Sequence, residues 1–430
     1  MAVLAIYKGN VTVFLLGPEI TRIRQCCPLK GSISACSNTI RFFCVSSSRC
    51  LYNISMEQLT LKIIENIAEI PAHGWDALAD GSPILSHAFF LALQESGCAT
   101  PKYGWKAQFL TLWEEDSLVG AMPLYLKMNS FGEHVFDFAW ADAYYRHGLP
   151  YYPKLVCTIP FTPVTGRRLL AGTDAMRQLL LKQALKYARD TGVSSLHCLF
   201  LDDADTGIAK ANGMMLREDV QFHWQNQGYL DFDEFLATLS RDKRKRIKQE
   251  RRRVNEAGIE LQCVTGENAT KDQWAFFASC YLHTLQLHNS PHQLNEDFFQ
   301  RIGVALPKNT LLVIASRDGR PIASALNYLT KDTLYGRSWG TFEFHSGLHF
   351  ETCYYQAIEF CIAHNIKTFE GGAQGEHKLA RGFLPVTTRS AHWLAHPQFA
   401  EAVENNLKQE TDAIAEYVDQ LNERSPFKHG

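Results

Sequence analysis

The chain has 430 residues, which is more than one hydrophobic core usually accommodates, and this length predicts two or three domains. Its composition, 46% hydrophobic and 20% charged, is that of an ordinary globular protein. A formal net charge of −2 argues against a surface that is basic throughout, and no run of eighteen apolar residues predicts a membrane span.

Residues 1–55 differ in composition from the rest of the chain. They hold six Lys and Arg against one acid, Glu19, and five of the twelve cysteines. A basic, serine-rich, acid-poor segment has the composition of an organellar transit peptide. We expect instead a disordered extension or an over-long gene start that is not part of the mature protein, because clearly patterned sequence begins at Met56.

The other seven cysteines are scattered, and no two of them form a CxxC pair. This spacing predicts buried free thiols in a reducing compartment. We therefore expect a cytoplasmic protein, with organellar import as the alternative if residues 1–55 are a transit peptide.

An internal repeat predicts two lobes. Each lobe reads as a β-hairpin, a one-faced helix, a residue that tolerates the left-handed conformation, and a strand. In the first lobe these elements occupy 109–126, 176–189, Gly192 and 193–200; in the second they occupy 311–329, 352–364, Asn365 and 366–370. We predict an α/β protein with a first lobe over 56–230, a basic helix leading into the second lobe over 231–260, the second lobe over 261–397 and a C-terminal helix over 398–430.

The first lobe is longer than the second between its hairpin and its helix. The additional segment is rich in aromatic residues, and its prolines at 150, 153, 160 and 163 exclude a helix there. Tyr151, Tyr152 and Lys154 are candidate substrate-binding residues in the wall of a pocket. The alternative is a proline-stiffened loop that fills its own core.

A basic run separates the two lobes. Residues 241–253 carry nine Lys and Arg on a predicted helix, more unbalanced charge than a solvated helix usually carries. Arg244, Lys245 and Lys248 share one face and are candidate phosphate-binding residues, for a cofactor or for an RNA backbone. The alternative is a charged linker helix.

A glycine-rich bend with dense polar side chains follows the last strand of the second-lobe repeat, over residues 370–383. Glu376 or His377 can take a proton from an attacking amine, and Lys378 and Arg381 can hold an anion or stabilise developing charge. Further candidate substrate-binding residues in this lobe are Arg337, Trp339 and Gln374. The alternative is a strand–loop junction held by its own salt bridges.

Several other chemistries lack their signatures. The histidines at 283, 288, 292, 392 and 396 are not accompanied by HExxH or cysteine pairs, so we predict no metal site. GxSxG, P-loop and GxGxxG motifs do not occur, which argues against hydrolases, NTPases and dinucleotide-binding enzymes.

Over nearly all of 56–430 the sequence resembles the FemAB-like predicted N-acyltransferases of the GNAT superfamily, a family of peptidoglycan biosynthesis and recognition type. The resemblance is carried by Leu85–Phe89, Pro123–Lys127, Val135–Tyr144, Tyr151–Leu155 and Pro160–Arg168 in the first lobe, and by Tyr335–Arg337, Glu370–Lys378, Arg381–Phe383 and Ser390–Trp393 in the second.

The resemblance implies two tandem GNAT-like lobes, each a mixed, mostly antiparallel sheet flanked by helices. It also implies that an amine, carried by a small molecule or a peptide, directly attacks the carbonyl of a thioester or an ester. Residues 343–349 depart from the [RQ]xxGx[GA] loop of acetyl-CoA-dependent members. Acyl-CoA and aminoacyl-tRNA, the donor of true FemAB enzymes, therefore both stay open.

Our leading hypothesis is an N-acyltransferase acting on an amine in a cleft between the lobes. One alternative is a FemAB-type transferase that depends on aminoacyl-tRNA. The other is a non-catalytic RNA-binding or scaffold protein that uses the basic helix over 241–253.

Overall fold

The computed structural model describes residues 2–7, 10–15, 59–291, 293–372 and 375–428. It forms two compact units, residues 1–60 and 61–430. In the first unit, β1 (Ala2–Tyr7) and β2 (Asn10–Leu15) pair as an antiparallel hairpin. The rest of the predicted extension over 1–55 lies outside the described residues. The fold and the site discussed below belong to the second unit.

Two sheets form the framework of the second unit over the described residues. The smaller has the order β3-β5-β6-β9, with β3 (Leu59–Ile64), β5 (Phe109–Glu114), β6 (Ser117–Met122) and β9 (Leu170–Ala171). The larger has eleven strands in the order β12-β13-β14-β15-β16-β11-β17-β10-β8-β7-β4. These are β4 (Trp105–Ala107), β7 (Leu124–Lys127), β8 (Lys154–Cys157), β10 (Ser195–Leu201), β11 (Met215–Gln225), β12 (Ile259–Thr265), β13 (Thr310–Arg317), β14 (Arg320–Leu329), β15 (Thr333–Thr341), β16 (Thr368–Glu370) and β17 (Leu384–Leu394).

The two lobes exchange their last strands at the centre of the large sheet. β11 and β17 pair antiparallel from Met215↔His392 to His223↔Leu384. The other edge of β11, from the first lobe, pairs with β16 of the second lobe, and the other edge of β17 pairs with β10 of the first. The range 261–397 that we predicted for the second lobe therefore contains a strand that lies between two first-lobe strands.

The predicted repeat is present in the structure, and the predicted α/β fold of two lobes is confirmed. Both hairpins form, β5–β6 and β13–β14. Each is followed along the chain by a helix, α4 (Asp174–Thr191) or α11 (Gln356–Ala363), and then by a parallel strand, β10 or β16. Gly192 and Asn365 adopt the left-handed conformation after these helices, with φ of 67° and 54°.

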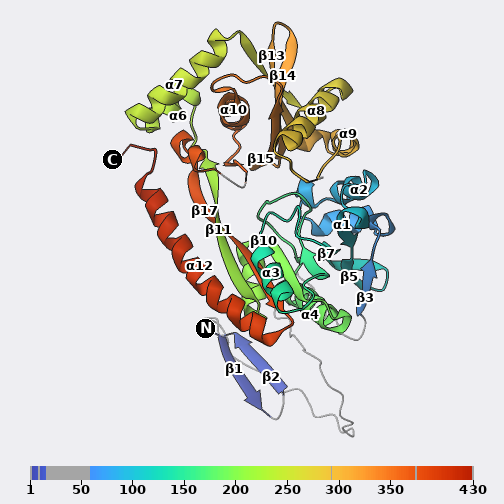
Figure 1. Ribbon diagram of the computed structural model, residues 1–430. Coiled ribbons are helices and arrows are strands. Elements are labelled where there is room, and N and C mark those ends of the chain that lie inside the picture. The colour runs from blue at the N-terminus through green and yellow to red at the C-terminus, as the bar shows by residue number, and fades with distance from the viewer. Residues whose placement is uncertain (1, 8–9, 16–58, 292, 373–374, 429–430) are drawn as a thin grey trace, which may run out of the picture. The chain divides into compact units, whose positions relative to one another are not determined.

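Helices cover the sheets on several sides. α12 (Pro397–Glu423) runs along β11 and β17 (Figure 1). α3 (Phe138–Arg146) was not predicted; it ends before the first of the four prolines, and the proline-rich stretch itself contains no helix. The remaining helices are α1 (Ala72–Leu78), α2 (His87–Glu95), α5 (Asp203–Ala211), α6 (Phe232–Thr238), α7 (Arg241–Glu256), α8 (Lys271–Leu287), α9 (Glu296–Ala305) and α10 (Leu348–Phe350).

A shared hydrophobic core fixes the lobes against each other. Phe89 of α2 packs edge to face on Phe298 of α9 and on Tyr328 of β14, with ring centroids 5.5 and 5.6 Å apart. All three side chains are buried. Residues from both lobes can therefore form one site with fixed geometry.

The strand pair β15–β16 opens toward the glycine-rich bend. The two strands run parallel and pair only over Thr333–Tyr335 and Thr368–Glu370, after which β16 ends while β15 continues. The register between β14 and β15 shifts where Leu326 faces Ser338 and Asn327 faces Gly336, which leaves Arg337 as the extra residue of a β-bulge. The bulge turns the Arg337 side chain toward the opening.

Candidate active site

Tyr151, Tyr152 and Lys154, predicted to bind substrate, belong to a buried ion network in the first lobe. Lys154 is fully buried, and its Nζ lies 2.8 Å from Glu133 Oε2 and also contacts Asp137. Burial alone would lower the pKa of Lys154, but these two carboxylates outweigh it and raise that pKa. Tyr151 donates its hydroxyl to Asp137 Oδ2 at 2.6 Å, so both Tyr151 and Lys154 already have partners within the protein.

The same network fixes the loop over residues 128–137. Lys154 Nζ donates to Ser130 Oγ at 2.9 Å, and the Tyr152 hydroxyl shares a 2.8 Å hydrogen bond with that Oγ. A second buried lysine, Lys127, lies over the ring of Trp105 at 3.4 Å and donates to the Phe131 carbonyl at 3.0 Å. The three predicted residues are therefore placed to hold this loop.

Arg337, predicted to bind substrate, lies at the centre of a polar group in the second lobe that also contains Glu370 and Lys378. Its Nη2 donates to the carbonyl of Phe161 in the first lobe at 3.2 Å, so it bridges the lobes. Glu370, at the end of β16, is partly buried; burial raises its pKa to about 8, against the opposing charge of Arg337. His223 Nε2 lies 3.9 Å from Glu370 Oε2, and burial lowers the pKa of His223 to about 4.

Lys378, a predicted catalytic residue, belongs to the same group. It is buried in the 3₁₀ turn η7 (Glu376–Arg381), where its Nζ donates to the Gly372 carbonyl at 2.8 Å. Burial lowers the pKa of Lys378 to about 7, and the charge of Arg337 adds to the decrease. Gly371 is required for this packing, because a Cβ there would lie 2.8 Å from the ring of Phe383 and 3.2 Å from the Lys378 chain.

The other predicted catalytic residues lie around this group in different roles. Glu376 is exposed and faces α12, where it accepts hydrogen bonds from Tyr417 at 2.7 Å and Arg424 at 2.9 Å. His377 Nε2 lies 3.1 Å from the Tyr354 hydroxyl. Glu376 is thus a surface ion-pair partner, and the structure does not bring it together with Lys378.

Arg381 is buried and links the bend to α7. Its Nη2 donates to both carboxylate oxygens of Glu250, at 2.8 and 3.0 Å, and its Nη1 donates to the His377 carbonyl at 2.6 Å. The guanidinium also lies over the ring of Phe350 at 3.3 Å. Arg381 therefore fixes the turn that carries Lys378 against two helices, α7 through Glu250 and α10 through Phe350.

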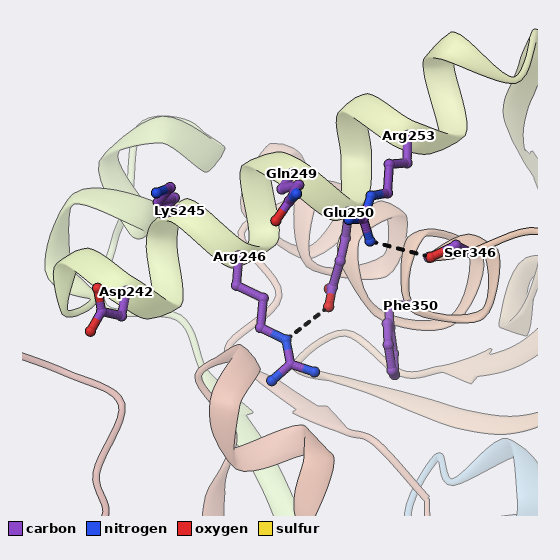
Figure 2. Close-up of a pocket in the computed structure, with 9 residues that line it drawn as sticks. Asp242, Lys245, Arg246, Gln249, Glu250, Arg253, Ser346 and Phe350 are labelled. Carbon is purple, nitrogen blue, oxygen red and sulfur yellow. Dashed lines mark hydrogen bonds and ion pairs between the residues drawn. The ribbon is translucent and has the colours of Figure 1, made fainter.

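A cavity of about 500 Å³ lies beside this link, between α7 and the residues before α10 (Figure 2). Arg246 and Arg253 reach it from α7, and Arg253 donates to Ser346 Oγ at 3.5 Å. The full lining is Asp242, Lys245, Arg246, Gln249, Glu250, Arg253, Ser346, Gly347 and Phe350. The lining holds three cations and two carboxylates, and Arg246 pairs with Glu250 at 3.1 Å, so Lys245 and Arg253 are the cations that this ion pair leaves for an anion.

Only one of the three predicted phosphate-binding residues lines this cavity. Lys245 does, whereas Arg244 and Lys248 lie elsewhere on α7, and Lys248 pairs with Asp233 at 2.9 Å. Trp339 packs on α10, with its ring centroid 4.7 Å from that of His349, and it does not line the cavity. Gln374 lies outside the described residues.

The sequence analysis missed Glu370, His223, Glu250, Arg246 and Arg253 as site residues. Two signals were present. A glutamate ends the apolar strand β16. The cavity-lining residues of α7 also recur at 242, 245, 246, 249, 250 and 253, which is one helical stripe.

The described part of the chain contains neither a metal-binding cluster nor a membrane-spanning helix. No group of three or more His, Cys, Asp or Glu side chains there is arranged to hold a metal ion. No helix there is long and apolar enough to cross a bilayer.

Two lobes that exchange a strand, with a parallel strand pair that opens in the second lobe, form a tandem GNAT-like fold. A family model described as FemAB-like, peptidoglycan biosynthesis/recognition, matches residues 66–429, and the chain belongs to that family. It is accordingly a transferase of the acyl or aminoacyl class. No curated protein matches the sequence.

Solved structures with a similar fold have low sequence identity to the chain. FemX is 13% identical with a TM-score of 0.48, and the match covers 78% of this chain and 98% of that one. The C-terminal domain of a putative lysylphosphatidylglycerol synthetase from Agrobacterium fabrum is 10% identical with a TM-score of 0.49, covering 79% and 96%. A tandem GNAT protein from the clavulanic acid pathway is 12% identical with a TM-score of 0.42, covering 79% and 99%.

Proposed function

We propose that the protein is an N-acyltransferase that moves an acyl or aminoacyl group onto an amine beside Lys378, Glu370 and Arg337. The observation that carries this proposal is a lysine with a pKa of about 7 and a carboxyl with a pKa of about 8 around one arginine. Between pH 7 and 8 about half or more of the lysine is a free base and about half or more of the carboxyl is a free acid. Such a pair suits a reaction that takes one proton and gives one.

The chemistry follows from these protonation states. The acceptor nitrogen attacks the carbonyl carbon of a thioester or ester, a C–N bond forms, and an electron pair moves to the carbonyl oxygen. Arg337 stabilises that negative charge. The neutral amine of Lys378 takes the proton that the nitrogen loses. When the C–S or C–O bond breaks, the Glu370 carboxyl gives a proton to the leaving sulfur or oxygen.

This assignment predicts the effects of two substitutions on transfer. Lys378→Ala is expected to lower kcat by at least about 100-fold, the usual contribution of a general base. The wild-type rate is expected to rise through pH 7 and fall above pH 8, and Glu370→Gln removes the alkaline fall.

Without a known substrate, the Cε resonance of Lys378 in [13C]lysine-labelled protein reports the same pKa. A midpoint near 10 rather than 7 contradicts the proposal.

The cavity beside α7 is the proposed site for the phosphates of the donor. Both donors carry phosphate that suits its cations: an aminoacyl-tRNA at the terminal nucleotide that bears the ester, and acyl-CoA at the far end of the pantetheine arm from the thioester. The FemAB-like family favours aminoacyl-tRNA, with a peptidoglycan-type amine as acceptor, and the basic helix α7 continues beyond the cavity. Membership of a transferase family leaves the non-catalytic scaffold reading without support.

A pair of neighbouring arginines tests the cavity as the donor site. Arg253→Glu is expected to weaken donor binding at least tenfold, because it places a carboxylate against the phosphates. Arg252→Glu is the matched control, since Arg252 pairs with Glu256 at 3.6 Å outside the cavity. Titration calorimetry with CoA and with an RNA acceptor-stem hairpin measures both. Equal losses in the two variants contradict a defined site and indicate general attraction to α7.

The cysteines support the proposed cytoplasmic location. In the described part of the chain all seven are free thiols, and five of them are buried. Disulfides form in oxidising compartments, so free thiols suit a reducing compartment.

A further inference from the structure

The loop over residues 128–137 is tied to Arg337 through Phe161 of the first lobe. Lys127 and Lys154 bind its backbone and side chains at Phe131, Ser130, Glu133 and Asp137. The Phe161 amide donates to the Gly132 carbonyl at 3.0 Å. The carbonyl of the same Phe161 accepts a hydrogen bond from Arg337. Phe161 therefore connects the loop over 128–137 to Arg337.

Three side chains of this loop have a buried polar atom without a hydrogen-bond partner among the described residues: Glu133 and Asp137, each of which binds Lys154 through its other carboxylate oxygen, and His134. The His134 ring hydrogen-bonds the Phe161 backbone, and it interacts electrostatically with Arg337. Its Nε2, however, is buried and has no hydrogen-bond partner among the described residues. Burial, and then the charge of Arg337, lower the pKa of His134 to about 4, so the ring is neutral and Nε2 presents a lone pair or N–H rather than a charge.

His134 also adopts an uncommon backbone conformation. Its φ is +62°, in the left-handed region that few residues other than glycine adopt, although Asn, Asp and His do so more often than the rest. A buried polar atom without a partner is the more costly feature of this residue. An unpaired ring nitrogen, in a loop held by two buried lysines, indicates that the ring is placed for a ligand.

We infer that His134 is a substrate-binding residue from the first lobe, and that its Nε2 accepts a hydrogen bond from the N–H of the acceptor amine. This inference rests on the proposed function and adds a contact to it. Arg337 and the protonated Glu370 offer donors, so the acceptor amine needs a neutral acceptor on the first-lobe side. The neighbouring arginine also disfavours an ammonium ion there, which selects the unprotonated amine that attack requires.

Stability separates a binding role from a structural one. Asn tolerates the left-handed conformation and keeps a polar group for the Phe161 bond. His134→Asn is therefore expected to leave the Tm unchanged or to raise it, measured by scanning calorimetry. Gly132→Ala, in the same loop, is expected to lower the Tm, because φ is +80° there and a Cβ would lie 2.6 Å from the Phe161 ring. A Tm loss in His134→Asn as large as that in Gly132→Ala overturns the inference.

The contact itself is testable with ethylamine as the probe and tetramethylammonium, which has no N–H, as the control. In [15N]histidine-labelled protein, ethylamine is expected to shift the Nε2 resonance of His134, assigned with His134→Gln, and tetramethylammonium is not. The Cε resonance of Lys378 is followed in the same titration. Movement of Lys378 without His134 overturns the inference and leaves the proposed function standing.

Two further results complete the test. A Lys378 that titrates near pH 10 and does not respond to ethylamine overturns the proposed function, and the inference with it. In a transfer assay, His134→Leu is expected to raise the KM for the amine about tenfold, the value of one hydrogen bond, while kcat changes much less. His134→Gln, which retains an acceptor, is expected to recover most of that loss. Equal kcat and KM for His134→Leu and wild type overturn the inference.

Discussion

Lys378→Met is expected to raise the free energy of unfolding by up to about 5 kcal/mol at pH 6, and by much less above pH 10. The folded pKa of Lys378 is about 7 against an ordinary 10.5, so below pH 7 the folded protein holds a buried charge that the unfolded chain exposes to water. Between pH 7 and 10.5 the folded lysine is neutral while the unfolded one still binds a proton. The unfavourable contribution therefore shrinks as pH rises, and methionine removes it altogether.

Glu370→Gln is the companion variant, and its gain is expected at the opposite end of the pH range. The folded carboxyl keeps its proton up to about pH 8, whereas the unfolded one loses it near 4.5. The wild type therefore loses stability as pH rises from 4.5 to 8, and glutamine relieves that loss above pH 8. Urea unfolding at pH 5, 6, 8 and 9 measures both variants. Lys367→Met, at an exposed lysine paired with Asp332, is the control without such a trend.

A stability gain in Lys378→Met would link the site to its function in physical terms. Residues that serve only the fold lose stability when they are replaced, whereas groups held in an unfavourable state for chemistry gain it. A loss at pH 6 equal to the loss at pH 9 would instead show that Lys378 is a charged structural residue, and would remove the basis for a general base here.

Local patterns predicted much of the fold. The two hairpins, the helices after them and the left-handed residues Gly192 and Asn365 all follow from short-range periodicity and turn chemistry, which the chain encodes locally. The exchange of β11 and β17 between the lobes does not follow from such local patterns. Both strands carry alternating patterns that fit either lobe, and their partners are chosen by the packing of distant segments.

The contrast between local patterns and distant packing also separates the site residues that were predicted from those that were missed. The bend with Lys378 was predicted because glycine and polar residues cluster in sequence there. Arg246 and Arg253 were missed in favour of Arg244 and Lys248, because the charge run alone does not show which stripe of α7 faces solvent. Ile247 and Val254, the buried residues of that helix, fix the orientation, and the cavity-lining stripe lies next to them.

Lys154→Met is expected to have the largest destabilising effect, about 3–5 kcal/mol in the free energy of unfolding by urea titration. Its removal leaves Asp137 buried without its lysine and leaves Glu133 with only Lys127, 4.0 Å away, and breaking a buried pair on one side costs far more than deleting the whole pair. Adding Glu133→Gln and Asp137→Asn should therefore recover part of the loss. Lys186→Met, which breaks an exposed pair with Asp190 on α4, is expected to change stability by less than about 1 kcal/mol. A loss no larger than that control would show that the network is not what fixes the loop carrying His134. The large loss would assign Tyr152 and Lys154 to the support of the acceptor site and leave contact with substrate to His134.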